Sequence, residues 1–153
     1  ELVKEHEIGV IIMEVSRSLE PEVGFLESVR KLATEKNIVL IFDECTSGFR
    51  ETFGGLHKKY GVDPDMAVFG KALGNGYAIT AVIGRREIME ASQGTFISST
   101  FWTERIGPAA GLKTLEVMER EKSWEQITEI GKDIEKHWSQ LSEKYNLPLE
   151  VSG

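Results

Sequence analysis

The sequence predicts an α/β fold built on a mostly parallel sheet, and two features of its first half carry that prediction. Residues 8–14, "IGVIIME", and residues 38–43, "IVLIFD", are almost continuous apolar runs of strand length. Between them, at about 22–36, apolar residues recur every three or four positions, as on one face of a helix. A helix between two strands that are apolar throughout is typical of a right-handed crossover in a parallel sheet covered by helices on both faces.

The second half adds strands at 65–70 and 78–84, after a glycine-rich loop with room for one short helix. About seven residues connect these two strands, too few for a parallel crossover, so the last strand is expected to run antiparallel to its predecessor. The sheet is therefore expected to be mixed. Helices are expected to follow at 85–92, at about 105–121 and at about 123–145.

The helix expected at 123–145 has an apolar stripe, which we expect to face a core. The stripe consists of Trp124, Ile127, Ile134, Trp138, Leu141 and Tyr145. The segment "LPLEVSG" that follows has the character of a strand just begun. Residues 122–153 are thus expected to begin a small second domain, and the chain to be part of a longer protein.

Composition and charge exclude several classes of partner. The net charge is -7, and the basic residues are scattered among acidic ones, which disfavours binding to nucleic acid. No apolar run approaches the roughly 20 residues that span a bilayer, and the N-terminus has no secretory pattern. The single cysteine, Cys45, excludes an internal disulfide and fits a reducing compartment. We expect a cytoplasmic protein with neither a membrane nor a nucleic acid as partner.

Asp43 and Glu44 stand at the end of the apolar strand at 38–43, and two adjacent carboxylates at this position indicate a chemical role. One chemistry that uses them is a magnesium site beside a nucleotide, as in a phosphate-loop ATPase. That site also needs a loop of the form G-x-x-x-x-G-K-[ST]. The Gly-Lys pair that follows an expected strand, Gly70-Lys71, is followed by Ala72, so the hydroxyl that would bind magnesium is missing. The ATPase hypothesis is the weaker alternative.

The other chemistry is that of pyridoxal 5'-phosphate (PLP), whose ring nitrogen stays protonated when a carboxylate lies against it. Asp43 is the candidate for that carboxylate. A lysine is also needed to form a Schiff base with the cofactor, and Lys71 follows the next strand, between Gly70 and a glycine-rich turn. Because the ends of parallel strands converge on one crevice, Asp43 and Lys71 can approach one ring from different sides. Spacing alone leaves open whether Lys71 is instead an ordinary surface lysine.

The segment from Phe42 to Glu90 resembles the central part of the class III PLP-dependent aminotransferases, in particular the branch containing glutamate-1-semialdehyde 2,1-aminomutase. The resemblance covers almost the whole chain. It rests on six motifs: Asp43-Glu44-Cys45, Ser47-Gly48-Phe49-Arg50, Gly54-Gly55, the run from Tyr60 to Asp65, Gly70-Lys71, and Ile83-Gly84-Arg85.

This resemblance implies a fold-type-I large domain, with residues 1–121 as its C-terminal half and the start of the linking helix. It implies Asp43 as the partner of the pyridine nitrogen and Lys71 as both Schiff-base lysine and general base. Cys45 takes the position of a valine that packs against the cofactor ring. Thr100 best matches a threonine that reaches the cofactor phosphate of the neighbouring subunit, with Thr103 as its local competitor.

The resemblance further implies a homodimer with shared active sites that moves an amino group from a small amino donor to an oxo acid or aldehyde. Phe101 and Trp102 replace a smaller, glycine-rich stretch, which indicates a substrate other than the aminomutase's semialdehyde. Val15 replaces a proline after Glu14, so Glu14 is assigned a structural role. The aminomutase reaction is the near alternative, and a fragment that binds no cofactor is the alternative from a different class.

Overall fold

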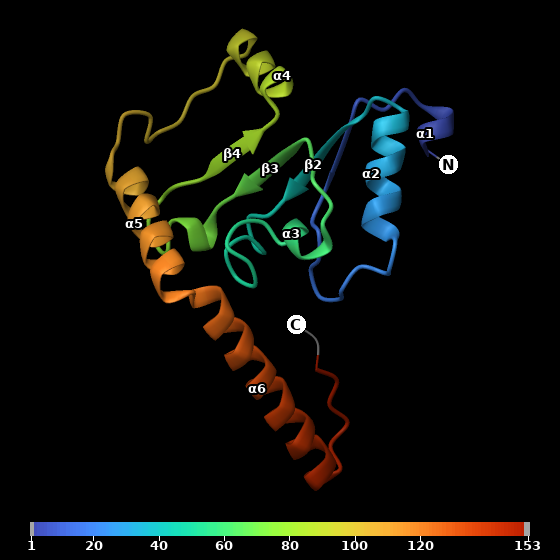
Figure 1. Ribbon diagram of the computed structural model, residues 1–153, viewed down its shortest axis with the longest axis vertical. Coiled ribbons are helices and arrows are strands. Elements are labelled where there is room, and N and C mark those ends of the chain that lie inside the picture. The colour runs from blue at the N-terminus through green and yellow to red at the C-terminus, as the bar shows by residue number, and fades with distance from the viewer. Residues whose placement is uncertain (1, 152–153) are drawn as a thin grey trace.

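A four-stranded sheet forms the centre of the computed structural model, which describes residues 2–151 (Figure 1). The strands lie in chain order: β1 (Val10–Met13), β2 (Val39–Asp43), β3 (Met66–Phe69) and β4 (Ala81–Gly84). β1, β2 and β3 are parallel, and β4 is antiparallel to β3. The predicted mixed α/β sheet is confirmed, including the reversed direction of the last strand.

Most of the helices lie where they were expected. Their bounds are α1 (Leu2–Glu5), α2 (Phe25–Glu35), α3 (His57–Tyr60), the 3-10 turn η1 (Lys71–Leu73), α4 (Arg86–Met89), the 3-10 turn η2 (Glu90–Gly94), α5 (Ile106–Glu121) and α6 (Ser123–Tyr145). A left-handed residue, Lys122 with φ +50°, separates α5 from α6. The single helix expected at 85–92 is instead α4 followed directly by η2.

The main core lies between α2 and one face of β1 and β2. Leu26 and Ala33 of α2 pack with Leu40 and Phe42 of β2, and all four are almost completely buried. Leu40 and Phe42 alternate with Val39 and Ile41, so they point to the same face of the strand. The apolar stripe of α2 therefore fixes this helix over β2, the strand that ends in Asp43.

A second cluster joins β3 and β4 to α5. Phe69 and Ala67 of β3 pack with Leu73 of η1, and Leu115 of α5 lies against them. Gly107 lets α5 approach closely, because a Cβ there would lie 2.4 Å from the Ala78 carbonyl oxygen. This packing fixes the turn that follows Lys71 against a long helix.

Asp65, just before β3, ties three elements together from a buried position. Its carboxylate accepts hydrogen bonds from the Leu40 backbone N–H at 2.8 Å, Arg30 at 2.8 Å and Arg85 at 3.1 Å. Burial alone raises the pKa of Asp65, but these hydrogen bonds outweigh it and leave the pKa below its ordinary value. The carboxylate therefore anchors α2 to the sheet.

The opposite face of the sheet and the stripe of α6 differ from expectation. Val10 and Ile12 of β1 are 51% and 62% exposed, although an apolar strand was expected to be buried on both faces. The prediction that the α6 stripe faces a core is wrong for most of its residues: Trp138 is 52% exposed, and only Trp124 packs, against Phe53 at a ring distance of 5.3 Å. In the described part of the chain, no element lies against the rest of this stripe, and α6 extends away from the sheet (Figure 1).

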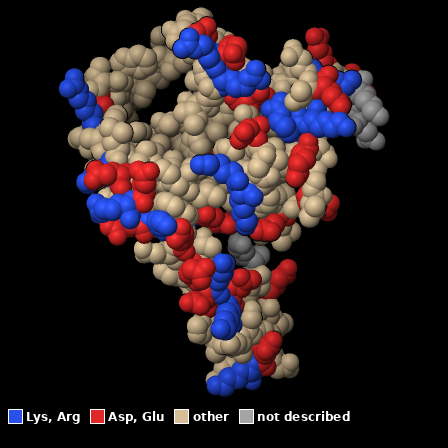
Figure 2. Space-filling view, in the orientation of Figure 1, with Lys and Arg blue, Asp and Glu red and all other residues tan. Residues whose placement is uncertain are grey.

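The strand expected in the last residues is also not formed. Residues 147–151 adopt no regular structure, and none of the four strands within residues 2–151 pairs with them. Residues 152 and 153 lie outside the described residues. On the surface, acidic and basic side chains are interspersed over the face drawn in Figure 2, including along α6. No helix within residues 2–151 has the length and apolar character needed to cross a membrane.

Candidate active site

The structure brings Asp43 and Lys71 to the same edge of the sheet. Asp43 is the last residue of β2, and its partner across the parallel ladder is Val68 of β3. Lys71 follows three residues after Val68, directly beyond the end of β3. The sequence-predicted convergence of the two residues is therefore seen at the level of the backbone. Within residues 2–151, no hydrogen bond or ion pair joins the two side chains directly.

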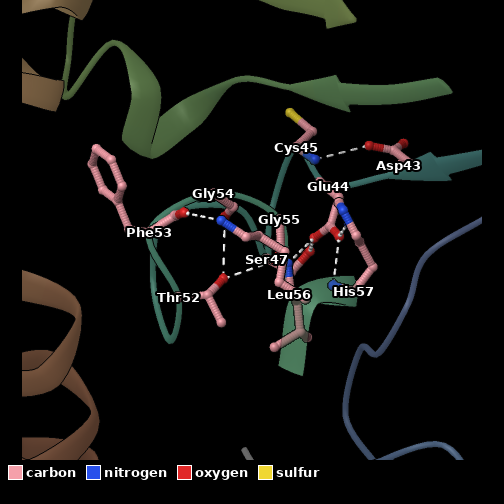
Figure 3. A network of polar contacts seen from close by, with 11 residues as sticks. Asp43, Glu44, Cys45, Ser47, Thr52, Phe53, Gly54, Gly55, Leu56 and His57 are labelled. Atoms are coloured by element: carbon pink, nitrogen blue, oxygen red, sulfur yellow. Dashed lines mark hydrogen bonds and ion pairs between the residues drawn. The ribbon is translucent and has the colours of Figure 1, made fainter. Parts of the chain in front are cut away.

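Glu44, the second member of the acidic pair, is completely buried and points away into the protein (Figure 3). Its Oε2 accepts hydrogen bonds from the Ser47 hydroxyl at 2.5 Å and the Leu56 backbone N–H at 2.9 Å. Its Oε1 accepts from the His57 backbone N–H at 3.0 Å and lies 2.8 Å from His57 Nδ1. Each oxygen thus accepts a backbone hydrogen bond from a residue that lies 12 or 13 positions later, Leu56 or His57.

The hydrogen bonds decide the charge state of Glu44. Burial alone raises the pKa of this carboxyl, but the bonds from the His57 ring, the Ser47 hydroxyl and the two backbone N–H groups outweigh it. The pKa consequently lies below the ordinary value of 4.5. Glu44 is a buried anion that holds the loop at residues 44–57, whereas Asp43 remains at the sheet edge. The sequence analysis assigned no separate role to Glu44.

Cys45 contacts the site through both its backbone and its side chain. Its backbone N–H donates to Asp43 Oδ1 at 3.0 Å, which orients the carboxylate at the strand end (Figure 3). Its thiol lies against Gly70, where an added Cβ would come within 2.8 Å of Sγ. Gly70 therefore allows the ends of β2 and β3 to approach, and the predicted site residues Asp43 and Cys45 are brought together.

Lys71 has an unusual backbone and a specific partner. Its φ is +39°, a left-handed conformation that residues other than glycine seldom adopt. Its Nζ donates a hydrogen bond to the Thr46 hydroxyl at 2.6 Å, and both residues are exposed. Strained residues of this kind cluster at functional sites. Thr46 was not identified from the sequence, since nothing in its local pattern distinguishes it from other loop residues.

Thr100 lies elsewhere, in the exposed segment between η2 and α5. Among the described residues, no hydrogen bond connects it to Asp43, Cys45 or Lys71. The N-terminus of α5 beyond it is capped by Glu104, whose carboxylate accepts from the backbone N–H groups of Ile106 and Gly107.

A cavity opens beside Lys71, bounded by η1, α5 and the start of α6. Its volume is about 1080 Å³, and Phe49, Arg50, Tyr77 and Lys113 are among its lining residues. The lining is mostly apolar, and three basic residues, Lys71, Arg50 and Lys113, contribute to it. Lys113 Nζ also donates to Glu116 Oε1 at 2.7 Å.

Comparison with known proteins identifies the family. The family model for aminotransferase class-III matches residues 2–153. The chain belongs to the class III aminotransferase family. Among its relatives, 3-aminobutyryl-CoA aminotransferase of Cloacimonas acidaminovorans is 40% identical over 134 residues, which are 87% of this chain and 32% of that protein. Glutamate-1-semialdehyde 2,1-aminomutase of Methanothrix thermoacetophila is 40% identical over 98% of this chain and 36% of its own length.

Solved structures agree with this assignment. An S-selective transaminase from Arthrobacter sp. superposes with a TM-score of 0.78 and 28% identity, covering 93% of this chain and 33% of that one. The PLP internal aldimine form of the FumI protein of Sphingopyxis sp. MTA144 superposes with a TM-score of 0.90, covering 95% and 37%. At 24% identity, the likeness to FumI concerns the fold alone. The chain spans about a third of the length of these relatives and of the Arthrobacter transaminase.

Proposed function

We propose that the protein containing this chain is a PLP-dependent class III aminotransferase, and that this chain supplies its catalytic lysine. It moves an amino group from a small amino donor to an oxo acid or aldehyde by a ping-pong route. The observation that carries this proposal is the position of Asp43 and Lys71 at neighbouring carboxyl ends of β2 and β3, in a chain of this family. The family membership removes the support for the ATPase alternative.

The residues at this sheet edge fit PLP. When bound, PLP supplies an electron sink for the carbon from which a proton is removed, and it carries the amino group between substrates. The Asp43 carboxylate, oriented by the Cys45 N–H, is an anion suited to hold the ring nitrogen protonated. Cys45, held against Gly70, offers a small apolar surface beside it. Lys71 would supply the amine that holds PLP, and its Nζ would accept and return the proton.

Thr100 is proposed to act on the cofactor phosphate of a second subunit, in a cytoplasmic homodimer with shared active sites. Its support is the exposed position of Thr100, in the segment between η2 and α5 that a second subunit can reach. Residues 1–121 are assigned to the large domain and 122–153 to the small one, with Lys122 at the break between α5 and α6.

Subunit mixing tests the shared site. A hybrid of a Lys71→Ala subunit and a Thr100→Val subunit keeps one intact site only if Thr100 acts across the interface. About half of the wild-type activity per dimer is then expected in the isolated hybrid. If Thr100 acts within its own subunit, both sites of the hybrid are damaged, and activity near that of the two single variants contradicts the proposal.

The cofactor itself is tested by trapping. PLP is added to the chain and to the protein at its native length, the visible spectrum is recorded, and the link is reduced with borohydride for peptide mapping. A reduced adduct on Lys71, lost in Lys71→Ala but kept in the control Lys136→Ala on α6, is expected. An adduct in the native-length protein but not in this chain supports the alternative that the chain alone is a non-catalytic piece. If Lys71 carries no adduct in the chain or in the native-length protein, the proposal is contradicted.

The aminomutase reaction is the second candidate, favoured by the 40% identity to the Methanothrix aminomutase. It returns the amino group to the same carbon skeleton and so needs no second substrate. Following both the amino donor and the keto product separates the two reactions. A net requirement for a separate amino acceptor supports the aminotransferase, and isomerisation of a single compound without an acceptor supports the aminomutase.

A further inference from the structure

We propose that Thr46 is a positioning residue for the amine of Lys71, holding Nζ in place whenever the lysine is not bonded to the cofactor. This inference rests on the proposed function. The observation behind it is the 2.6 Å hydrogen bond between Lys71 Nζ and Thr46 Oγ1, which joins residues 25 positions apart. It connects the loop after β2 with the turn after β3, the two places from which the site is built.

The position of the Thr46 hydroxyl is fixed by its own loop. The Thr46 carbonyl accepts a hydrogen bond from Arg50 Nε at 2.6 Å. On either side of Thr46, the buried Glu44 carboxylate binds the Ser47 hydroxyl, and the Glu44 carbonyl accepts from the Gly48 N–H at 2.8 Å. An exposed threonine is thus carried on an anchored turn, so its hydroxyl is a fixed point to which a flexible side chain can bind.

Lys71 needs such a point because its side chain is long and exposed. Immobilising a lysine side chain costs rotamer freedom, and a charge-assisted hydrogen bond offsets much of that cost. A carboxylate partner would only accept hydrogen bonds and would favour the charged amine. A hydroxyl accepts from an ammonium group and donates to a neutral amine, so Thr46 remains a partner in both states. An amine that must attack a carbonyl needs that neutrality.

The chemistry gives this contact a use in every turnover. Attachment to PLP would join Lys71 Nζ to the aldehyde carbon, with the aldehyde oxygen leaving as water. The amine of Lys71 would be free whenever substrate occupied the cofactor, and would have to return afterwards. Held by Thr46, the released amine stays at the end of β3 and does not swing into solvent, which shortens the search for the aldehyde carbon.

The test compares Thr46→Val, which keeps the branched shape but removes the hydroxyl, with Thr46→Ser, which keeps the hydroxyl. The native-length protein is freed of PLP, and the rate of covalent attachment at Lys71 after PLP addition is followed by absorbance and borohydride trapping. Thr46→Val is expected to slow attachment roughly fivefold, the loss of one hydrogen bond of about 1 kcal/mol, with Thr46→Ser within twofold of wild type. Equal rates in all three proteins, at equal melting temperatures, overturn the proposal.

A second measurement needs no cofactor. In the PLP-free proteins, acetic anhydride labels lysine amines, and labelling of Lys71 is compared with that of Lys31 on α2 by peptide mapping. Removal of the hydroxyl frees Nζ, so Thr46→Val is expected to label Lys71 about two- to fivefold more than wild type or Thr46→Ser. Unchanged labelling in Thr46→Val overturns the inference. Absence of PLP attachment in every protein, with the labelling change present, refutes the proposed function but leaves the Thr46–Lys71 contact supported.

Discussion

Replacing Glu44 is expected to destabilise the protein far more than replacing its neighbour Asp43. Glu44 is 0% exposed, and its carboxylate accepts from the Ser47 hydroxyl, the backbone N–H groups of Leu56 and His57, and the His57 ring. Glu44→Ala leaves at least two backbone N–H groups without an acceptor in a buried place. Each such group costs about 1–3 kcal/mol, and the cavity adds to it, so the free energy of unfolding is expected to fall by roughly 3–5 kcal/mol.

Glu44→Gln refines the estimate, because it keeps the shape and removes the charge. A glutamine amide has one acceptor oxygen, and its NH2 group cannot accept from the N–H groups that the second carboxylate oxygen now serves. If the amide oxygen takes the place of Oε1, the Leu56 N–H at Oε2 faces another donor. The expected loss is about 2–3 kcal/mol, intermediate between wild type and Glu44→Ala.

Chemical denaturation of the native-length protein, followed by circular dichroism, measures these changes. Asp43→Asn is the matched control: Asp43 is only partly buried and accepts one hydrogen bond, from the Cys45 N–H at 3.0 Å, which an amide oxygen also accepts. Its expected loss is below about 1 kcal/mol. If Glu44→Ala and Asp43→Asn destabilise the protein to the same extent, the division of the acidic pair into a structural and a chemical carboxylate is refuted.

The remaining predictions concern pH, chemistry and packing. The pKa of Glu44 is lowered in the folded state, so the ionised carboxylate stabilises the protein above about pH 4.5, and this stabilisation is lost as the pH falls toward the folded-state pKa. Below about pH 4.5 the free energy of unfolding should therefore decline less with pH in Glu44→Gln than in wild type, as measured by unfolding curves. Asp43→Asn should keep PLP on Lys71 but slow the spectral change on addition of an amino donor by about a hundredfold, measured in a single turnover; an unchanged rate would contradict the role of Asp43. Gly70→Ala should lower the free energy of unfolding by about 1–3 kcal/mol, because the added Cβ would lie 2.8 Å from Cys45 Sγ. Cys45→Ala in the same protein should restore part of this free energy, and no recovery in the double variant would show that the thiol is not the obstacle.

The backbone framework was predictable because its signals are local. Apolar runs placed β1 to β4 within a few residues, and the short connection from Lys71 to Tyr77 predicted the reversed strand. The helix at 123–145 followed from the periodicity of its apolar residues, and a helix was also expected at about 105–121, where α5 lies. Asp43 and Lys71 were found for the same reason, since each directly follows an apolar run, and the family resemblance was confirmed by the match to residues 2–153.

The partners of the site residues could not be predicted in this way. Glu44 and Asp43 are adjacent carboxylates in the sequence, yet one is saturated by a loop 12 and 13 residues away and the other lies at the sheet edge. Thr46 meets Lys71 only because β2 and β3 end side by side. A hydrogen bond between residues so far apart depends on where the chain returns, and no local pattern contains that information.

By itself, the sequence determined the positions and directions of the strands, the helix positions and the two residues proposed for PLP chemistry, because strand and helix formation follow the spacing of apolar side chains. Only the tertiary structure decided which carboxylate is buried, which hydroxyl binds Lys71, and that the apolar stripe of α6 and the outer face of β1 are exposed in this chain. An apolar pattern indicates that a surface is suited to burial. Whether that surface is covered depends on another segment lying against it.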